Sequence, residues 1–288
     1  MKSSLSVRKK EILTGYMFLL PWLAGILIFV LFPLIYSVLL SFNAVNITPS
    51  EGIKLTYKGL QYYNHAWNVD TQFKLNLGET IFMISCAAPV IQVFSLIISM
   101  LLNTQIKLKG FFRTLFFLPV IIMSGPVISK LLTRYTVDFA EAGSSVYIFI
   151  SALPSFLRNP SMLILNNLVL IFWFSGLQIL LYLNGLQKIS PDLYEAAQID
   201  GASSWETFWK ITLPHMNPFI VICTVYTIID LAAYSENSVN KKISSHIFDF
   251  DQLYSFSASM AWIYFLVIIL LLVVLYLLFK LLGRRSGK

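Results

Sequence analysis

The chain has 288 residues, of which 57% are hydrophobic and 12% are charged, and its formal net charge is +7. A mean hydropathy of +0.73, with repeated apolar runs long enough to cross a bilayer at about 20 helical residues each, excludes an ordinary soluble domain. Helices are expected rather than a barrel, because no ten-residue alternation of apolar and polar side chains is visible.

The apolar runs predict an all-α integral membrane protein with six transmembrane helices. The first run has no charged residue from Tyr16 to Ser41, which is too long for the apolar part of a signal peptide, and no small-residue cleavage site follows it. We therefore expect it to be retained as a span. The fifth run contains Asp230 and is opened by Pro218. The expected spans are 16–41, 80–102, 111–133, 162–184, 217–236 and 258–282.

The distribution of Lys and Arg predicts the orientation of these spans. Most basic residues gather in the N-terminal tail 1–15, in the second and fourth loops, and at the C-terminal end (Lys2, Arg8, Lys9, Lys10, Lys107, Lys109, Arg113, Lys188, Lys210, Lys280, Arg284, Arg285 and Lys288). Both termini and the fourth loop are therefore expected to be cytoplasmic, with 286–288 as a tail after a membrane domain of 16–285. This topology accounts for the positive charge, so nucleic-acid binding is not expected.

The fourth loop, residues 190–214, has the pattern of two short helices joined at a glycine. Ser190 before Pro191 suits a helix start, and Gly201 can take the left-handed conformation that ends the first helix. Ser203 and Glu206 form a capping box that begins a second helix, whose expected limit is Pro214.

The side chains of this elbow favour docking in a groove of another protein over lying on lipid. An interfacial helix expects a basic polar face, whereas the first helix carries Asp192, Glu195 and Asp200 without Lys or Arg. Its small residues permit close approach of a partner backbone; they are Ala196, Ala197, Gly201 and Ala202.

Residues 195–218, "EAAQIDGASSWETFWKITLPHMNP", resemble the EAA signature of permease subunits in bacterial binding-protein-dependent ABC importers. The stretches "GFFRTLFFLPVIIMSGPV" and "SFSASMAWIYFLVIILLL" resemble the carbohydrate branch of that family, of the maltose, raffinose and glycerol-phosphate type. The resemblance extends over residues 13–285. One departure is the exterior loop "SENSVNKKISSHIFDFDQ", where sugar-type members commonly have a Gly-Gly-Pro stretch.

The resemblance implies a type I ABC importer permease fold in the bacterial cytoplasmic (inner) membrane. It implies a second homologous permease, a cytoplasmic ATPase dimer, an extracellular solute-binding protein and a sugar substrate. ATP and Mg²⁺ would be bound by the ATPase; in this chain the tail "GRRSGK" lacks the spacing of a P-loop. The elbow would be the coupling helix that docks in the ATPase, and the implied coupling residues are Glu195, Ala196, Ala197, Asp200, Gly201 and Ala202.

Polar residues within the spans are candidates for the substrate path. Thr227 and Tyr234 lie three and four residues from Asp230, which predicts one shared helix face, and the fourth span adds Trp173 and Gln178. Rings and hydrogen-bonding groups suit a sugar, and a carboxylate inside the bilayer should face a cavity or a partner. The alternative is that these groups bond helix to helix.

Other functions and sites receive less support from the sequence. A secondary transporter of a small polar solute would show repeated halves and several buried charges, and a membrane enzyme would show clustered carboxylates or histidines near one face. His65, His215 and His246 are scattered over different loops, so no metal site is expected. Cys86 and Cys223 lie within spans, where a thiol behaves as a small hydrophobe.

Overall fold

The computed structural model describes residues 3–48, 52–104, 110–111, 114, 145–166, 168–247 and 254–286. Contacts divide the chain into two units, one of residues 1–75 and 242–266 and the other of residues 76–241 and 267–288. The expected third span, 111–133, lies outside the described residues except at two positions.

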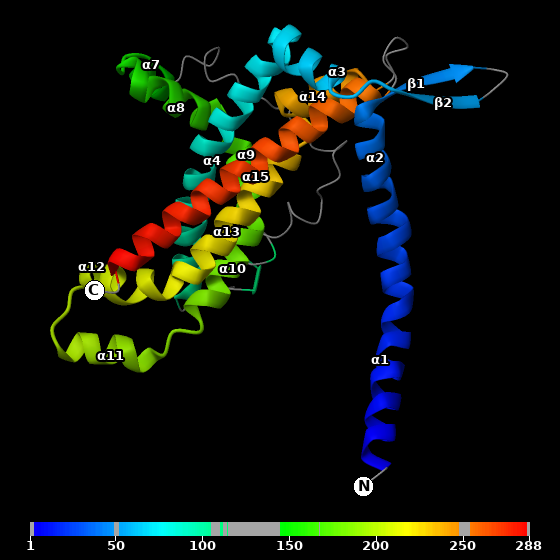
Figure 1. The fold of residues 1–288 in the computed structure, drawn as a ribbon. Coiled ribbons are helices and arrows are strands. Elements are labelled where there is room, and N and C mark those ends of the chain that lie inside the picture. Colours follow the sequence, from blue (N-terminus) through cyan, green and yellow to red (C-terminus); the bar gives the residue numbers. More distant parts are fainter. Residues whose placement is uncertain are drawn as a thin grey trace. The chain divides into compact units, whose positions relative to one another are not determined.

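The first unit begins with a long apolar helix that one wide turn interrupts. α1 (Ser3–Ile26) continues through the π-helical turn Leu27–Leu31 into α2 (Phe32–Phe42), the blue ribbon of Figure 1. Pro33 follows this turn closely; a proline ring crowds the preceding helical turn and donates no hydrogen bond, and a wider turn leaves room for the ring. The expected first span lies within this helix, and the described chain buries none of its apolar stretch.

A two-stranded antiparallel hairpin follows α2, and the sequence analysis did not predict it. β1 (Asn43–Thr48) pairs with β2 (Gly52–Tyr57), with Asn43 opposite Tyr57. The strands are short, so the alternation that would have revealed them is weak. The other described elements are helical, and the expected helical bundle holds with this addition.

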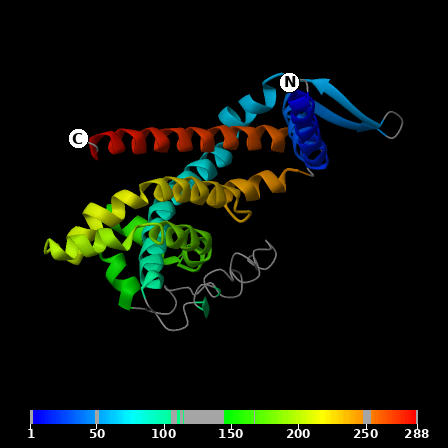
Figure 2. The ribbon, with the colours of Figure 1, turned by 90° about the horizontal axis from the view of Figure 1, so that it is seen from below.

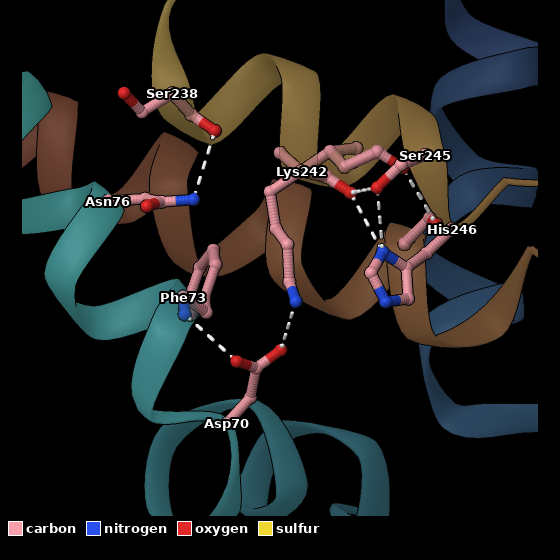
Figure 3. A network of polar contacts seen from close by, with 9 residues as sticks. Asp70, Phe73, Asn76, Ser238, Lys242, Ser245 and His246 are labelled. Carbon is pink, nitrogen blue, oxygen red and sulfur yellow. Dashed lines mark hydrogen bonds and ion pairs between the residues drawn. The ribbon is translucent and has the colours of Figure 1, made fainter.

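The start of α4 (Thr71–Asn103) is fixed by Asp70, which follows α3 (Gln61–Asn64) and a π turn, His65–Val69. Asp70 Oδ1 accepts a hydrogen bond from the Phe73 backbone N–H at 3.0 Å, and Oδ2 lies 3.1 Å from Lys242 Nζ (Figure 3). Burial alone would raise the pKa of Asp70, but the Phe73 amide and the Lys242 ammonium hold that pKa below its ordinary value.

The segment expected as an exterior loop contains α14 (Ser238–Ser245). Asn237 joins it to the end of α13 (Leu213–Ala233): its Oδ1 accepts from the Asn240 backbone N–H at 2.7 Å, and its Nδ2 donates to the Ala232 carbonyl at 3.0 Å. One side chain therefore caps the start of one helix and the end of another. Asn76 on α4 donates to the Ser238 carbonyl at 3.2 Å, as Figure 3 shows.

Three further expected spans coincide with long helices. α4 contains 80–102, α13 covers most of 217–236, and α15 (Ser255–Ser286) contains 258–282. Together with the N-terminal run, four helical segments among the described residues are long and apolar enough to cross a membrane. These support a multi-pass membrane protein.

The described part of the expected fourth span, 162–184, is helical except at Ser175, and residue 167 lies outside the described residues. It comprises the end of α8 (Ser155–Asn166), α9 (Leu168–Phe174) and most of α10 (Gly176–Leu186), and the shorter α7 (Ser145–Ser151) precedes them. The break between α9 and α10 lies at Ser175, whose hydroxyl donates to the Ile171 carbonyl. That carbonyl is the regular partner of the Ser175 amide, so the side chain competes with the helix backbone.

α10 and α13 pack closely in the second unit and lie side by side in both ribbon views (Figure 1, Figure 2). Gly185 permits this approach, because a Cβ atom there would lie 2.8 Å from the Phe219 ring and 3.0 Å from Met216 Cε. The buried cluster between the helices consists of Tyr182, Leu186, Ile189, Met216 and Cys223.

Candidate functional site

The first helix of the elbow is α11 (Pro191–Ile199), and its end has the geometry that the sequence predicted. Gly201 has φ +75°, its N–H donates to the Gln198 carbonyl at 3.1 Å, and the Ala202 N–H donates to the Ala197 carbonyl at 2.9 Å. This pair of bonds is the Schellman motif, which satisfies carbonyls at a helix end and favours glycine at the left-handed position. Ser190 precedes Pro191 as expected but makes no side-chain cap bond.

The second helix begins at the predicted capping box but does not end where it was expected to. In α12 (Ser204–Thr207) the Glu206 N–H donates to Ser203 Oγ at 3.3 Å, and the Ser203 N–H donates to Glu206 Oε2 at 3.0 Å. The helix then continues through the π turn Phe208–Thr212 directly into α13. Pro214 does not stop it, because the wider turn ahead of the proline accommodates the ring.

The predicted coupling residues form an exposed surface at this elbow. Glu195, Ala196, Asp200 and Gly201 are exposed, Ala202 is half-buried and only Ala197 is buried. Beyond the two adjoining residues, a Cβ atom at Gly201 would meet no atom of the described residues within 4 Å. A hollow of about 430 Å³ lies beside the glycine and is lined by residues of both elbow helices, including Ala197, Asp200, Ala202, Glu206 and Lys210.

Large apolar side chains also stand exposed on the elbow. Ile199 at the end of α11 is 87% exposed, and Trp205 and Trp209 form an aromatic cluster with Phe208 in which the two indole rings lie 5.5 Å apart. Isolated exposed apolar residues are ordinary on a soluble protein. A helix end that exposes Ile199 beside small residues and carboxylates has the character of a protein-docking surface.

Two of the predicted path residues bond helices to one another. Thr227 on α13 is fully buried, and its Oγ1 accepts from Gln178 Nε2 on α10 at 2.9 Å and from Gln92 Nε2 on α4 at 2.6 Å. Tyr182 OH donates to Gln92 Oε1. The arrangement joins three helices through side-chain hydrogen bonds, which is the alternative that the sequence left open.

The other predicted path residues are more dispersed. Tyr234 lies just beyond the end of α13, and its ring packs edge-on against Phe174 at 5.6 Å. Asp230 is half-buried, unlike the fully buried Thr227. Trp173 is half-buried on α9, and its Nε1 has no hydrogen-bond partner among the described residues.

Gln92 and Tyr182 are the polar residues of this network that the sequence analysis missed. Each lies within an apolar stretch of its helix, and a hydrogen-bonding residue in a membrane segment is itself a signal of a specific contact. Gln92 also borders an almost wholly apolar cavity of about 330 Å³, which is lined from α4, α13 and α15. Within the described ranges no group of three or more His, Cys, Asp and Glu could hold a metal ion.

Comparisons with known proteins agree with this architecture. The family described as "Binding-protein-dependent transport system inner membrane component" matches residues 72–288. The chain is 28% identical to the probable ABC transporter permease protein YesP of Bacillus subtilis, with 96% of this chain and 93% of YesP covered. It is 30% identical to the multiple sugar-binding transport system permease protein MsmF of Streptococcus mutans, with 72% and 70% covered.

Two other similar proteins add to these comparisons. The chain is 28% identical to the lactose transport system permease protein LacF of Rhizobium radiobacter, with 76% of this chain and 73% of LacF covered. A crystal structure of a bacterial ABC transporter involved in alginate import has a chain with a TM-score of 0.67 at 19% identity, and 99% of each chain is covered. That likeness shows the same fold. The chain therefore belongs to the family of binding-protein-dependent transport system inner membrane components and is a permease subunit of an ABC importer.

Proposed function

We propose that this permease carries a carbohydrate that an extracellular binding protein delivers. LacF and MsmF are named for lactose and multiple-sugar transport, which supports a sugar rather than another polar solute. In this proposal a second homologous permease completes the path through the cytoplasmic membrane. A separate pair of cytoplasmic ATPase subunits binds ATP and Mg²⁺ and drives the cycle.

We further propose that α11 is the element that docks on the ATPase. The observation that carries this proposal is the open, exposed elbow around Gly201. Apart from the two adjoining residues, no described part of the chain lies within 4 Å of a Cβ atom built there. Glu195 and Asp200 are exposed carboxylates on the same short helix, and they could accept charge-assisted hydrogen bonds from basic groups of the ATPase.

The test is the substitution Gly201→Asn, which adds bulk to the elbow. Asparagine tolerates the left-handed conformation better than other side chains, and the space around Gly201 is open in this chain, so folding should be preserved. We expect ATPase co-purification to fall by about tenfold or more, equivalent to about 1.4 kcal/mol of association energy. Glu195→Ala should give a milder loss.

The matched control is Gly78→Asn on α4, another exposed glycine whose added Cβ would meet no atom within 4 Å. This variant should retain a full ATPase complement and wild-type uptake. If Gly201→Asn also retains both, α11 is not the docking element.

A further inference from the structure

α11 is joined to the rest of the second unit by very few side chains. Among residues 191–200 all are exposed except Ala197, which is buried, and Tyr194, which is half-buried. Figure 1 shows α11 projecting from the bundle on two connecting segments. A force applied to this helix therefore has few routes into the membrane-spanning helices.

Tyr194 provides the most direct of these routes. Its ring packs against the buried cluster of α10 and α13 defined above, and its OH lies 3.1 Å from Thr212 Oγ1. Thr212 is only 4% exposed, so the hydrogen bond is held at a fixed position. A cavity of about 300 Å³ lies beside the contact and is bordered by both residues together with Gln198, Thr207 and Phe208.

Thr212 occupies a special position in the chain. It is the last residue of the π turn Phe208–Thr212, and Pro214 follows two residues later at the start of α13. In Figure 1 the ribbon bends here, so that α12 turns aside from α13. A π turn next to a proline lacks a regular helical hydrogen bond and is a natural place for a helix to bend.

We propose that Tyr194 is a positioning residue that transmits movement of α11 to this bend through its hydrogen bond with Thr212. The inference rests on the proposed docking of α11 on the ATPase. The aromatic ring is well suited to the role, because it has few rotatable bonds and is anchored in the packed cluster. The other connection runs along the backbone through Gly201 and Ala202. This turn lies on the exposed side of the elbow and joins α11 to α12 less directly.

The experiment removes the hydroxyl groups without removing the side chains. Tyr194→Phe, Thr212→Val and the double variant are purified as complexes with the ATPase and the second permease and placed in vesicles with the binding protein. Sugar uptake per ATP hydrolysed is measured for each. We expect each single variant to lower this ratio by about two- to tenfold, the range for one lost neutral hydrogen bond, and the double variant to be no worse than either single variant.

Two substitutions serve as matched controls. Thr224→Val removes a hydroxyl from the same helix, where Thr224 Oγ1 bonds only to the Ile220 carbonyl one turn earlier among the contacts found for it. Tyr57→Phe removes a hydroxyl from a tyrosine that is 78% exposed. Both should keep the wild-type ratio of uptake to hydrolysis.

The possible outcomes separate this inference from the docking proposal. Tyr194→Phe should retain the ATPase in the complex, since the Tyr194 hydroxyl faces Thr212. A wild-type ratio of uptake to ATP hydrolysis in Tyr194→Phe would contradict the proposed role of Tyr194. Additive effects in the double variant would contradict it as well. So would a loss of thermal stability and complex yield with the ratio unchanged, which is the signature of a purely structural hydrogen bond. Docking itself fails only if Gly201→Asn leaves ATPase binding intact.

Discussion

Thr227, one of the predicted path residues, is a buried polar residue whose hydrogen bonds join three helices. Its hydroxyl accepts two amide hydrogen bonds and donates to the Cys223 carbonyl at 2.8 Å, and the side chain is fully buried. With Gln92 and Gln178 it holds α4, α10 and α13 together. Polar groups in this position stabilise the bundle because the alternative is an unpaired amide in a nonaqueous interior.

The first prediction concerns this network. Thr227→Val keeps the shape of the side chain but leaves two amide donors without their acceptor, so we expect the unfolding free energy to fall by about 0.6–2 kcal/mol. The measurement is the denaturation midpoint of the purified protein in detergent. Thr224→Val is the control and should change stability much less. Equal stability of both variants would show that the network contributes little.

Asp230 is the strongest single candidate for the sugar path, since it is a half-buried carboxylate on α13 that makes no hydrogen bond to another helix among the described residues. We predict that Asp230→Ala lowers uptake at limiting sugar while complex assembly and basal ATP hydrolysis persist, because a cavity-facing carboxylate offers hydrogen bonds to sugar hydroxyls. Uptake assays over a range of sugar concentrations test this. Loss of the assembled complex would instead assign Asp230 to helix packing.

At the scale of elements, a π turn just before a proline occurs twice in the described chain. The π turns Leu27–Leu31 and Phe208–Thr212 each precede a proline, Pro33 and Pro214, by two residues. In both places a wider turn lets the helix continue past a residue that would otherwise break it. Pro33 and Pro214 therefore each follow a local change of pitch and do not mark a helix end.

The attachment of α14 near the start of α4 yields a prediction about neighbouring lysines. Lys242 and Asp70 are 19% and 12% exposed, whereas Lys241 and Glu236, paired at 3.1 Å, are 61% and 31% exposed. Lys242→Met should lower the free energy of unfolding by more than the roughly 0–1 kcal/mol expected for an exposed ion pair. The loss should be smaller than the roughly 3–5 kcal/mol expected for a fully buried pair. Lys241→Met is the control, and thermal unfolding in detergent compares the two. Equal losses of stability in the two variants would mean that the Asp70–Lys242 pair stabilises the protein no more than the exposed Glu236–Lys241 pair.

The Asp70–Lys242 ion pair also predicts that the stability of the folded protein depends on pH. The pKa of Asp70 is lower in the folded protein than in the unfolded chain, so its contribution is fully present above the unfolded pKa of about 3.9 and is lost as the pH falls through the folded pKa. Asp70→Asn retains a helix-capping acceptor but not the charge. We expect the difference in melting temperature between wild type and Asp70→Asn to shrink as the pH is lowered from 6 to 3; a constant difference would contradict this assignment.

At the scale of the whole molecule, basic residues and apolar helices together predict an orientation in the membrane. Lys107 and Lys109 lie in the expected second loop, Lys188 and Lys210 flank the elbow, and α15 ends near Arg284 and Arg285. Such residues remain preferentially on the cytoplasmic side. The elbow would then face the compartment in which the ATPase is found.

This orientation is testable with reporter fusions. A fusion at Lys109 should report a cytoplasmic location, and a fusion at Lys241, on α14, should report an exterior one. Reporters active only on one side of the membrane provide the measurement, and a fusion at the C-terminus serves as a cytoplasmic reference. The same location for Lys109 and Lys241 would refute the predicted topology.

The sequence by itself determined the features that depend on neighbouring residues. Long apolar runs defined the helices α4, α13 and α15. The capping box of Ser203 with Glu206 and the helix end at Gly201 were readable because caps involve residues only a few positions apart. Family membership was also accessible, because the elbow motif is a continuous stretch of chain.

Only the tertiary structure decided which polar residues meet. Gln92 and Thr227 are separated by 135 positions and Tyr182 and Gln92 by 90, so no local pattern could pair them. The same holds for Tyr194, whose role depends on the ring lying against α10 and α13. The end of α13 at Ala233 also depends on later residues, because the side chains of Asn237 and Asn240 both donate to the Ala232 carbonyl. Burial and hydrogen bonding between distant segments are set by packing, and packing is fixed only when the whole bundle is assembled.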